Sequence, residues 1–249
     1  MGPVKASPQE QLRLLELADL DAELGRLEHR RRALPELAEV ERLEARDAEV
    51  RDAIVAAETE VGDLAREQTK AEGDVDQVRS RIDRDRTRLD AGQVSSPREL
   101  ENLQSEIESL RRRQADLEEI VLSVMERRED VEGRLNSLTA ERARLVGQHE
   151  DAVGRRDAAL GEIGEQEAKL HQRRSAITTG VPADVLALYE KLREQHGVGA
   201  AALRRGRCEG CHMELNTVDV NRIRAAAPDE VVRCEECRRI LVRTPESGL

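Results

Sequence analysis

Residues 92–99 read GQVSSPRE and separate two long runs of helical sequence. Gly92 suits the end of the first helix. Ser96, Pro97 and Glu99 suit the N-cap, first and third positions of the next one, which is a capping box with proline where a helix tolerates it best. We therefore predict that the chain reverses here, so that residues 92–97 form the tip of an intrachain antiparallel hairpin. The alternative is a parallel dimer of continuous helices, which would have to run through these capping signals.

The run after the tip carries a narrow apolar stripe. Steps of alternately three and four residues from Leu100 to Ile177 meet mostly apolar side chains, with Glu, Arg, Asp and Gln between them. A stripe sustained over so many heptads is typical of a coiled-coil seam rather than of a globular helix. Arg128, Arg142 and Arg156 fall on seam positions. We expect their stems to lie along the seam with the charges in solvent; a looser seam that another helix completes is the alternative.

The run before the tip has the same pattern with one interruption. The stepping continues from Val50 to Leu89, whereas the leucines from Leu17 to Leu34 follow a different phase. The phase changes at Pro35, and a proline inside a helix costs about 3 kcal/mol. The sequence thus predicts a coiled-coil hairpin over residues 8–179, with a kink or a break near residue 35.

A different kind of sequence fills residues 180–249. Gly180 and Pro182 end the second arm, and residues 183–195 have the apolar spacing of a short amphipathic helix. Beyond it the pattern favours strands over residues 201–204, 231–233 and 240–242, and a short helix over residues 217–226. This arrangement predicts a small zinc-ribbon-like domain.

Four cysteines form two C-x-x-C pairs, Cys208 with Cys211 and Cys234 with Cys237, with 22 residues between the pairs. Two such turns present four thiolates to one tetrahedral ion, and four sulfur ligands leave no open position. A domain with so few apolar residues also needs a further source of stability, such as a bound metal ion. We therefore predict one structural Zn²⁺. A redox-active dithiol lacks its usual βαβ context. We expect His212, which follows Cys211, to be an exposed loop residue; displacement of one cysteine ligand by His212 is the alternative.

The composition argues against an enzyme and against a membrane protein. The chain has no Trp or Phe and one Tyr, Tyr189, so it lacks the aromatic side chains that a thick core normally buries. It has no phosphate-binding glycine loop and no nucleophile beside a base. No apolar run reaches the length of about 20 residues that spans a bilayer, and the N-terminus lacks a secretory signal. We expect a cytoplasmic, non-enzymatic protein.

The arginines of the C-terminal domain are the candidate contacts for a partner. The net charge of −11 arises entirely within residues 1–179, because residues 180–249 hold 11 basic and 11 acidic side chains. The candidates for contacts to a nucleic acid or a protein partner are Arg204, Arg205, Arg207, Arg222, Arg238 and Arg239. The simpler interpretation pairs Arg238, Arg239 and Arg243 with Glu235 and Glu236. The ribbon that follows the short helix has no Phe, Tyr or Trp side chain on which a base could stack.

Three motifs carry a resemblance to a known family. They are SPREL at residues 96–100, LYEKLR at residues 188–193, and the cysteine contexts CEGCHM at 208–213 and CEECRRIL at 234–241. Together with the hairpin pattern they resemble the bacterial C4-type zinc-ribbon family with an N-terminal helical hairpin. Most members are uncharacterised. Some are linked to flagellar or type III secretion regulation, through binding of the sigma-54 factor, secretion-system proteins or a flagellin messenger RNA. The resemblance implies an adaptor or regulator and carries over no catalytic residue.

These observations converge on one expectation. We expect a mainly α protein, with a long antiparallel coiled-coil hairpin followed by a small C4 zinc ribbon, that binds protein partners as a monomeric adaptor. The alternative function is a nucleic-acid-binding or transcription-linked regulator that acts through the arginine-rich ribbon.

Overall fold

The computed structural model describes residues 4–94 and 96–249; Ser95 of the predicted tip lies outside the described residues. The helices are α1 (Pro8–Arg32), α2 (Pro35–Asp90), α3 (Pro97–Thr178), α4 (Ala183–His196) and α5 (Thr217–Ala225). The strands are β1 (Ala200–Arg204), β2 (Arg207–Cys208), β3 (Val232–Arg233) and β4 (Ile240–Arg243). The chain divides into a hairpin unit, Ala38–Val153, and a ribbon unit, which joins the N-terminal segment up to Leu37 to Gly154–Leu249. The predicted mainly α fold class is confirmed.

Proline and serine set where the long helices begin. The hydroxyl of Ser7 accepts a bond from the Glu10 amide (3.3 Å), and the Glu10 carboxylate accepts one from the Ser7 amide (2.7 Å), which is a complete capping box for α1. Helix α1 ends at Arg32 and α2 starts at Pro35. The predicted discontinuity near residue 35 is therefore a break between two helices, with proline in the first turn, where its missing N–H costs nothing.

The reversal at the tip follows the predicted caps. Helix α2 ends at Asp90, and Gly92 adopts a left-handed conformation (φ 66°) that glycine reaches without steric cost. Helix α3 begins at Pro97, and the Ser96 hydroxyl accepts a bond from the Glu99 amide at 3.3 Å. Local sequence thus fixes the turn of the hairpin.

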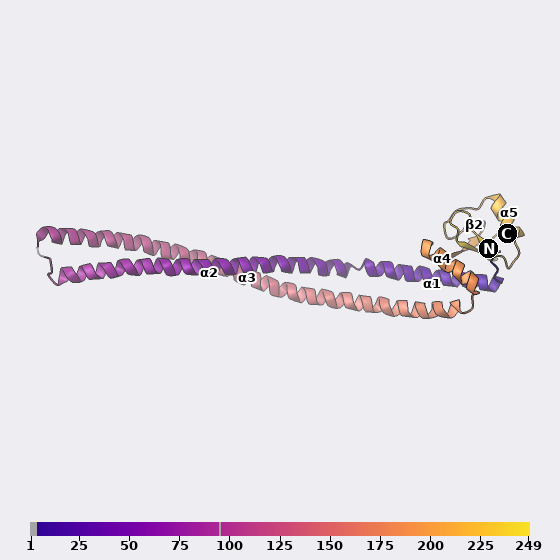
Figure 1. Cartoon of the computed structure of the whole chain (residues 1–249), viewed down its shortest axis with the longest axis horizontal. Coiled ribbons are helices and arrows are strands. Elements are labelled where there is room, and N and C mark those ends of the chain that lie inside the picture. Colours follow the sequence, from indigo (N-terminus) through magenta and orange to yellow (C-terminus); the bar gives the residue numbers. More distant parts are fainter. Residues whose placement is uncertain (1–3, 95) are drawn as a thin grey trace. The chain divides into compact units, whose positions relative to one another are not determined.

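The hairpin unit is a two-helix coiled coil in which α2 and α3 lie side by side (Figure 1). Buried side chains recur at multiples of seven residues on both helices. In α2 they include Leu43, Val50, Ala57, Leu64 and Ala71. In α3 they include Leu103, Leu117, Val124, Val131, Leu145 and Ala152. The predicted seam is confirmed, and burial is confined to this one stripe.

Ion pairs across the seam show that the two helices are antiparallel. The pairs include Arg46 with Glu141, Glu60 with Arg134, and Arg81 with Glu106. As the residue numbers rise along α2, those of their partners on α3 fall, as two antiparallel helices require. Exposed pairs of this kind contribute about 0–1 kcal/mol each, and they define the register rather than supplying the stability.

Two of the seam arginines bond across the helix pair. Arg128 donates to Gln68 Oε1 at 3.2 Å, and Arg142 donates to Asp47 Oδ1 at 3.2 Å. The side chains of Arg128 and Arg142 remain 39% and 45% exposed. Their stems therefore lie at the seam as expected, but their guanidinium groups also find polar partners on α2.

The ribbon unit contains a four-stranded sheet with the order β2-β1-β4-β3. Strands β1 and β4 pair in parallel, with Ala200 opposite Ile240, and the two outer pairs are antiparallel. The N-terminal segment also joins this unit. The Val231 amide donates to the Val4 carbonyl at 3.1 Å, and the Ala6 amide donates to the Asp229 carbonyl at 2.8 Å. Residues from both ends of the sequence thus close one unit.

Helices α1 and α4 cover an apolar face of this sheet. Their buried side chains form one cluster with the central strands, and the cluster includes Leu14, Leu17, Val185, Tyr189, Ile240 and Val242. Each Å² of apolar surface that this cluster removes from water stabilises the unit by about 25 cal/mol. The ribbon therefore shares its core with α1 and α4.

A buried carboxylate connects three helices of the ribbon unit. The side chain of Asp21 in α1 is 1% exposed. It accepts bonds from both Nε (2.7 Å) and Nη2 (3.3 Å) of Arg174 in α3, and from the Tyr189 hydroxyl of α4 at 2.6 Å. Arg174 also pairs with Glu190 at 2.5 Å. The only tyrosine of the chain is thus used to satisfy a buried acid.

No helix within the two described stretches, 4–94 and 96–249, has both the length and the apolarity that crossing a membrane requires.

We predict that Val50→Ala lowers the free energy of unfolding by about 2 kcal/mol, because it leaves a cavity in a seam position that is 1% exposed. Val55→Ala is the matched control on the same helix. Val55 is 61% exposed, so its replacement should change stability by about 0.5 kcal/mol or less. Denaturant unfolding followed by circular dichroism measures the free energy of unfolding of both variants. Equal losses of stability would contradict the assignment of Val50 to the buried seam.

We also predict that Asp21→Asn destabilises the ribbon unit by about 3 kcal/mol, because it removes one partner of a buried ion pair. Asp19→Asn, an exposed change on the same helix, should leave thermal stability unchanged. Calorimetry of the two variants beside the wild type tests the difference. A melting temperature of Asp21→Asn equal to that of Asp19→Asn would show that the network contributes nothing.

Candidate metal centre

Two turns with the same backbone hydrogen bonds hold the four cysteines. In the first, the Cys208 amide donates to the Met213 carbonyl (3.1 Å) and the His212 amide donates to the Cys208 carbonyl (2.7 Å). In the second, the Cys234 amide donates to the Arg239 carbonyl (3.0 Å) and the Arg238 amide donates to the Cys234 carbonyl (2.9 Å). His212 (φ 61°) and Arg238 (φ 64°) occupy equivalent left-handed positions. The two C-x-x-C sequences therefore fold into two copies of one knuckle.

Each knuckle aims amide groups at its first sulfur. Burial raises the pKa of the Cys208 thiol, and the N–H groups of Cys211 and Gly210 oppose that rise by donating to its sulfur. Burial likewise raises the pKa of Cys234, and the equivalent amides of the second knuckle oppose it. Because the thiolate is the form that binds metal, these donors favour the ligand state inside a half-buried site.

The four sulfurs fit a tetrahedral ion. All four Sγ atoms lie within 4.8 Å of one another. The Cys208–Cys237 and Cys211–Cys234 sulfur pairs are each 3.8 Å apart. A tetrahedron with metal–sulfur bonds of about 2.3 Å has edges of about 3.8 Å. These spacings match a four-sulfur shell around a single ion.

An apolar layer supports the cysteines. Cys208 and Cys234 are buried with Leu203 of β1, Ile223 of α5 and Leu241 of β4. Helix α5 is capped by Asn216, whose side chain accepts a bond from the Asp219 amide at 2.8 Å. Strands and helix in this region were predicted from the sequence; the two-residue β2 was not.

His212 lies beside the sulfurs but does not join them. Its side chain is exposed, and within the described residues the cluster suited to a metal ion consists of the four cysteines alone. The alternative ligand set with histidine is therefore not the geometry that the chain adopts.

The candidate contact arginines do not form one free cationic face. Arg204 pairs with Glu246 (2.7 Å), Arg222 with Glu235 (2.7 Å), Arg238 with Glu235 (3.3 Å) and Arg207 with Glu214 (3.6 Å). Of the six candidates, Arg205 and Arg239 have no such carboxylate partner in the part of the chain that the structure describes. Each pair is exposed and reversible, so these side chains stay accessible to a partner only in competition with a local carboxylate.

Arg239 and Arg243 have structural partners that a charge count does not reveal. Arg239 donates to the carbonyls of Val198 (3.2 Å) and Gly210 (3.0 Å). Arg243 donates to five carbonyls between Ile223 and Glu230, at 2.8–3.5 Å, and so satisfies the C-terminal end of α5. The expected pairing with Glu235 holds for Arg238 and is wrong for these two arginines.

Family models match most of the chain. A model of the CT398-like coiled coil hairpin domain matches residues 17–197, and a model of the C4-type zinc ribbon domain matches residues 207–241. The uncharacterized protein Rv2229c of Mycobacterium tuberculosis is 38% identical over 243 residues, which is 96% of this chain and 98% of that protein. The uncharacterized protein ML1638 of Mycobacterium leprae is 31% identical over 224 residues, 88% of this chain and 94% of that one.

Solved structures show the same architecture. A Mycobacterium smegmatis structure with 37% sequence identity matches with a TM-score of 0.83 and covers 97% of this chain and 100% of its own. CT398 from Chlamydia trachomatis matches with a TM-score of 0.73 at 20% identity and covers 95% of this chain and 98% of its own. At that identity the likeness concerns the fold.

We predict that Cys234→Ser abolishes metal binding and lowers the melting temperature, because three thiolates cannot close the shell that holds both knuckles together. His212→Ala is the control; it should retain one metal ion per chain. Elemental analysis of the purified variants, with a thiol-reactivity assay, gives the comparison. Metal retained in Cys234→Ser but lost in His212→Ala would assign the fourth ligand to histidine.

Proposed function

Because the chain belongs to the family that joins a CT398-like coiled coil hairpin domain to a C4-type zinc ribbon domain, we propose that it is a non-enzymatic adaptor that binds other proteins in the bacterial cytoplasm. The zinc ribbon would hold one structural Zn²⁺ on Cys208, Cys211, Cys234 and Cys237. The adaptor role is supported most directly by the hairpin unit, where burial is confined to one stripe and the remaining helix surface faces outward.

The ligand set favours a structural ion over a catalytic one. Four cysteines complete the tetrahedral shell of zinc and leave no position at which water or a substrate would bind. Zinc binding stabilises small domains by roughly 10 kcal/mol or more at neutral pH. Here the ion would hold both knuckles, and through them β1 and β4, in the arrangement on which α1 and α4 pack. Free thiols of this kind also favour a reducing compartment.

Apolar side chains outside the seam support a protein-binding surface. Leu122 is 60% exposed and Met125 is 45% exposed, and they lie three residues apart on one face of α3. Neither is needed to pair α3 with α2. Exposed apolar groups that the fold does not use commonly mark contacts with other proteins.

The nucleic-acid alternative rests on the ribbon arginines. Most of them pair with carboxylates or with backbone carbonyls, and the ribbon after α4 has no Phe, Tyr or Trp side chain for base stacking. These observations favour the protein-binding proposal. Nucleic-acid binding would appear as an affinity that falls steeply with salt and that Arg204→Ala, Arg238→Ala and Arg239→Ala weaken.

Capture with the tagged full-length chain, followed by direct binding of the purified candidate partner, tests the adaptor proposal. Leu122→Glu with Met125→Glu should weaken binding of a hairpin partner by about tenfold or more, because burying an unpaired carboxylate is costly. Ala140→Glu with Ala143→Glu has the same spacing on exposed positions of α3 and serves as the control. The proposal fails if no purified protein binds the wild-type chain directly.

A further inference from the structure

A groove in the ribbon unit presents cations that the fold does not neutralise. It lies between α1 and the C-terminal part of α3 and has a volume of about 510 Å³. Its lining residues are Glu23, Arg26, Leu27, Arg30, Gln166, Lys169, Leu170 and Arg173. Four cations thus face one carboxylate, in a chain whose net charge is −11.

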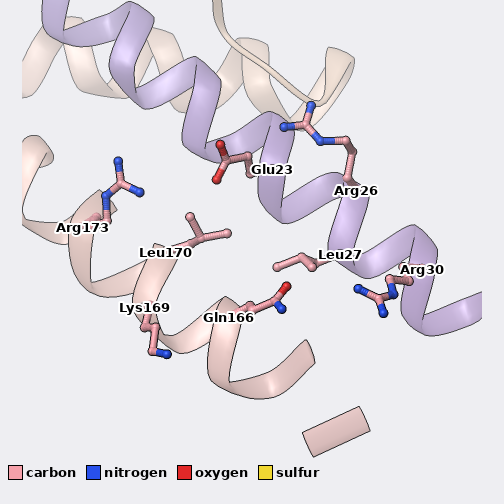
Figure 2. A pocket seen from close by; sticks show the side chains of 8 residues that line it. All are labelled: Glu23, Arg26, Leu27, Arg30, Gln166, Lys169, Leu170 and Arg173. Atoms are coloured by element: carbon pink, nitrogen blue, oxygen red, sulfur yellow. The ribbon is translucent and has the colours of Figure 1, made fainter. Parts of the chain in front are cut away.

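Both helices build the groove from the same pattern. Residues 23–30 read ELGRLEHR and residues 166–173 read QEAKLHQR, so each helix supplies a polar residue, a cation, a leucine and a second cation at positions i, i+3, i+4 and i+7. That spacing places all four side chains on one helix face. Figure 2 shows Leu27 and Leu170 pointing toward each other across the gap, with Arg30 and Arg173 to either side and the ends of Arg26 and Lys169 turned outward. The result is an apolar floor with a basic rim.

Apart from Glu23, which lines the groove itself, two acids of the same helices are already engaged elsewhere. Glu28 pairs with Arg32, and Glu167 pairs with Arg31. Within the described residues, Arg26, Arg30, Lys169 and Arg173 have no ion pair, whereas Arg174, the next residue along α3, is bound to Asp21. The rim charges are therefore available to a ligand.

We infer that this groove binds an acidic amphipathic helix of a partner protein. Leucines at the floor of a groove between two helices accept the apolar face of a third helix, in the helix-in-groove mode of recognition. Four unneutralised cations at the rim favour Asp and Glu flanking that face, which provides charge complementarity. Nucleic acid fits less well, because the floor offers leucines and no aromatic side chain. The inference rests on the proposed adaptor function and names its partner class.

A synthetic helical peptide with Leu at heptad a and d positions and Glu at the flanking positions tests the site on the full chain. The peptide should bind the wild type, and its affinity should fall with salt. Arg26→Glu with Lys169→Glu should weaken binding by about tenfold or more, since reversed charges repel the peptide. Arg111→Glu with Arg112→Glu, two exposed cations of the hairpin unit, should leave affinity unchanged. The Lys-flanked version of the peptide should not bind.

Several outcomes would overturn the groove assignment without touching the adaptor proposal. The first is that the acidic peptide does not bind the wild type. The second is that it binds the Arg26→Glu, Lys169→Glu variant as tightly as the wild type. The third is that a short oligouridylate displaces the bound peptide. A dimer in sedimentation that this double variant abolishes would assign the groove to a second copy of the chain. Conversely, a purified partner that binds the double variant as well as the wild type would leave the adaptor function intact and remove the groove from it.

Discussion

The convergence of four sulfurs within 4.8 Å is the constraint on which the ribbon unit depends. The knuckles that carry them follow β2 and β3, and each is joined by a short connection to a central strand. Holding the knuckles together therefore holds β1 beside β4 in parallel, a pairing that antiparallel turns cannot make locally. The apolar face of those two strands is then available to Leu14, Leu17 and Tyr189. Loss of the sulfur cluster would remove the surface on which two helices pack.

The hairpin unit obeys a different constraint. Two antiparallel helices can bury one narrow stripe each, so most of their surface is exposed whatever the sequence. Polar seam residues such as Arg128 and Arg142 cost apolar burial, but their bonds to Gln68 and Asp47 define which residues face each other. A two-helix coiled coil has a large exposed surface and a small buried core. Such a shape suits contact with large partners better than enclosure of a small substrate.

Local signals were enough to predict the parts of the fold that local chemistry determines. Ser96 and Pro97 fix the tip, Pro35 fixes the break, and the cysteine spacing fixes the knuckles, because each acts within a few residues of itself. The contacts that were missed join distant segments. Asp21 meets Arg174 and Tyr189 across more than 150 residues of sequence, and no periodicity marks such an acid as buried. Similarly, the hydrogen bonds from Arg243 to five carbonyls could not be predicted from the sequence, because they form only when β4 lies beside the end of α5.

The two sets of basic residues in the ribbon unit illustrate why charge counts alone mislead. The arginines around the cysteines attract attention by their number, yet Arg239 and Arg243 are held by backbone carbonyls and most of the others by carboxylates. The cations of the groove are fewer and lie in the acidic part of the sequence, where the net charge conceals them. Whether a cation already has a partner, rather than how many cations lie nearby, determines which one can bind a ligand. A paired guanidinium must first break its ion pair, whereas an unpaired one at the rim of the groove loses only its bound water. By that criterion the groove between α1 and α3 is the stronger electrostatic site of the unit.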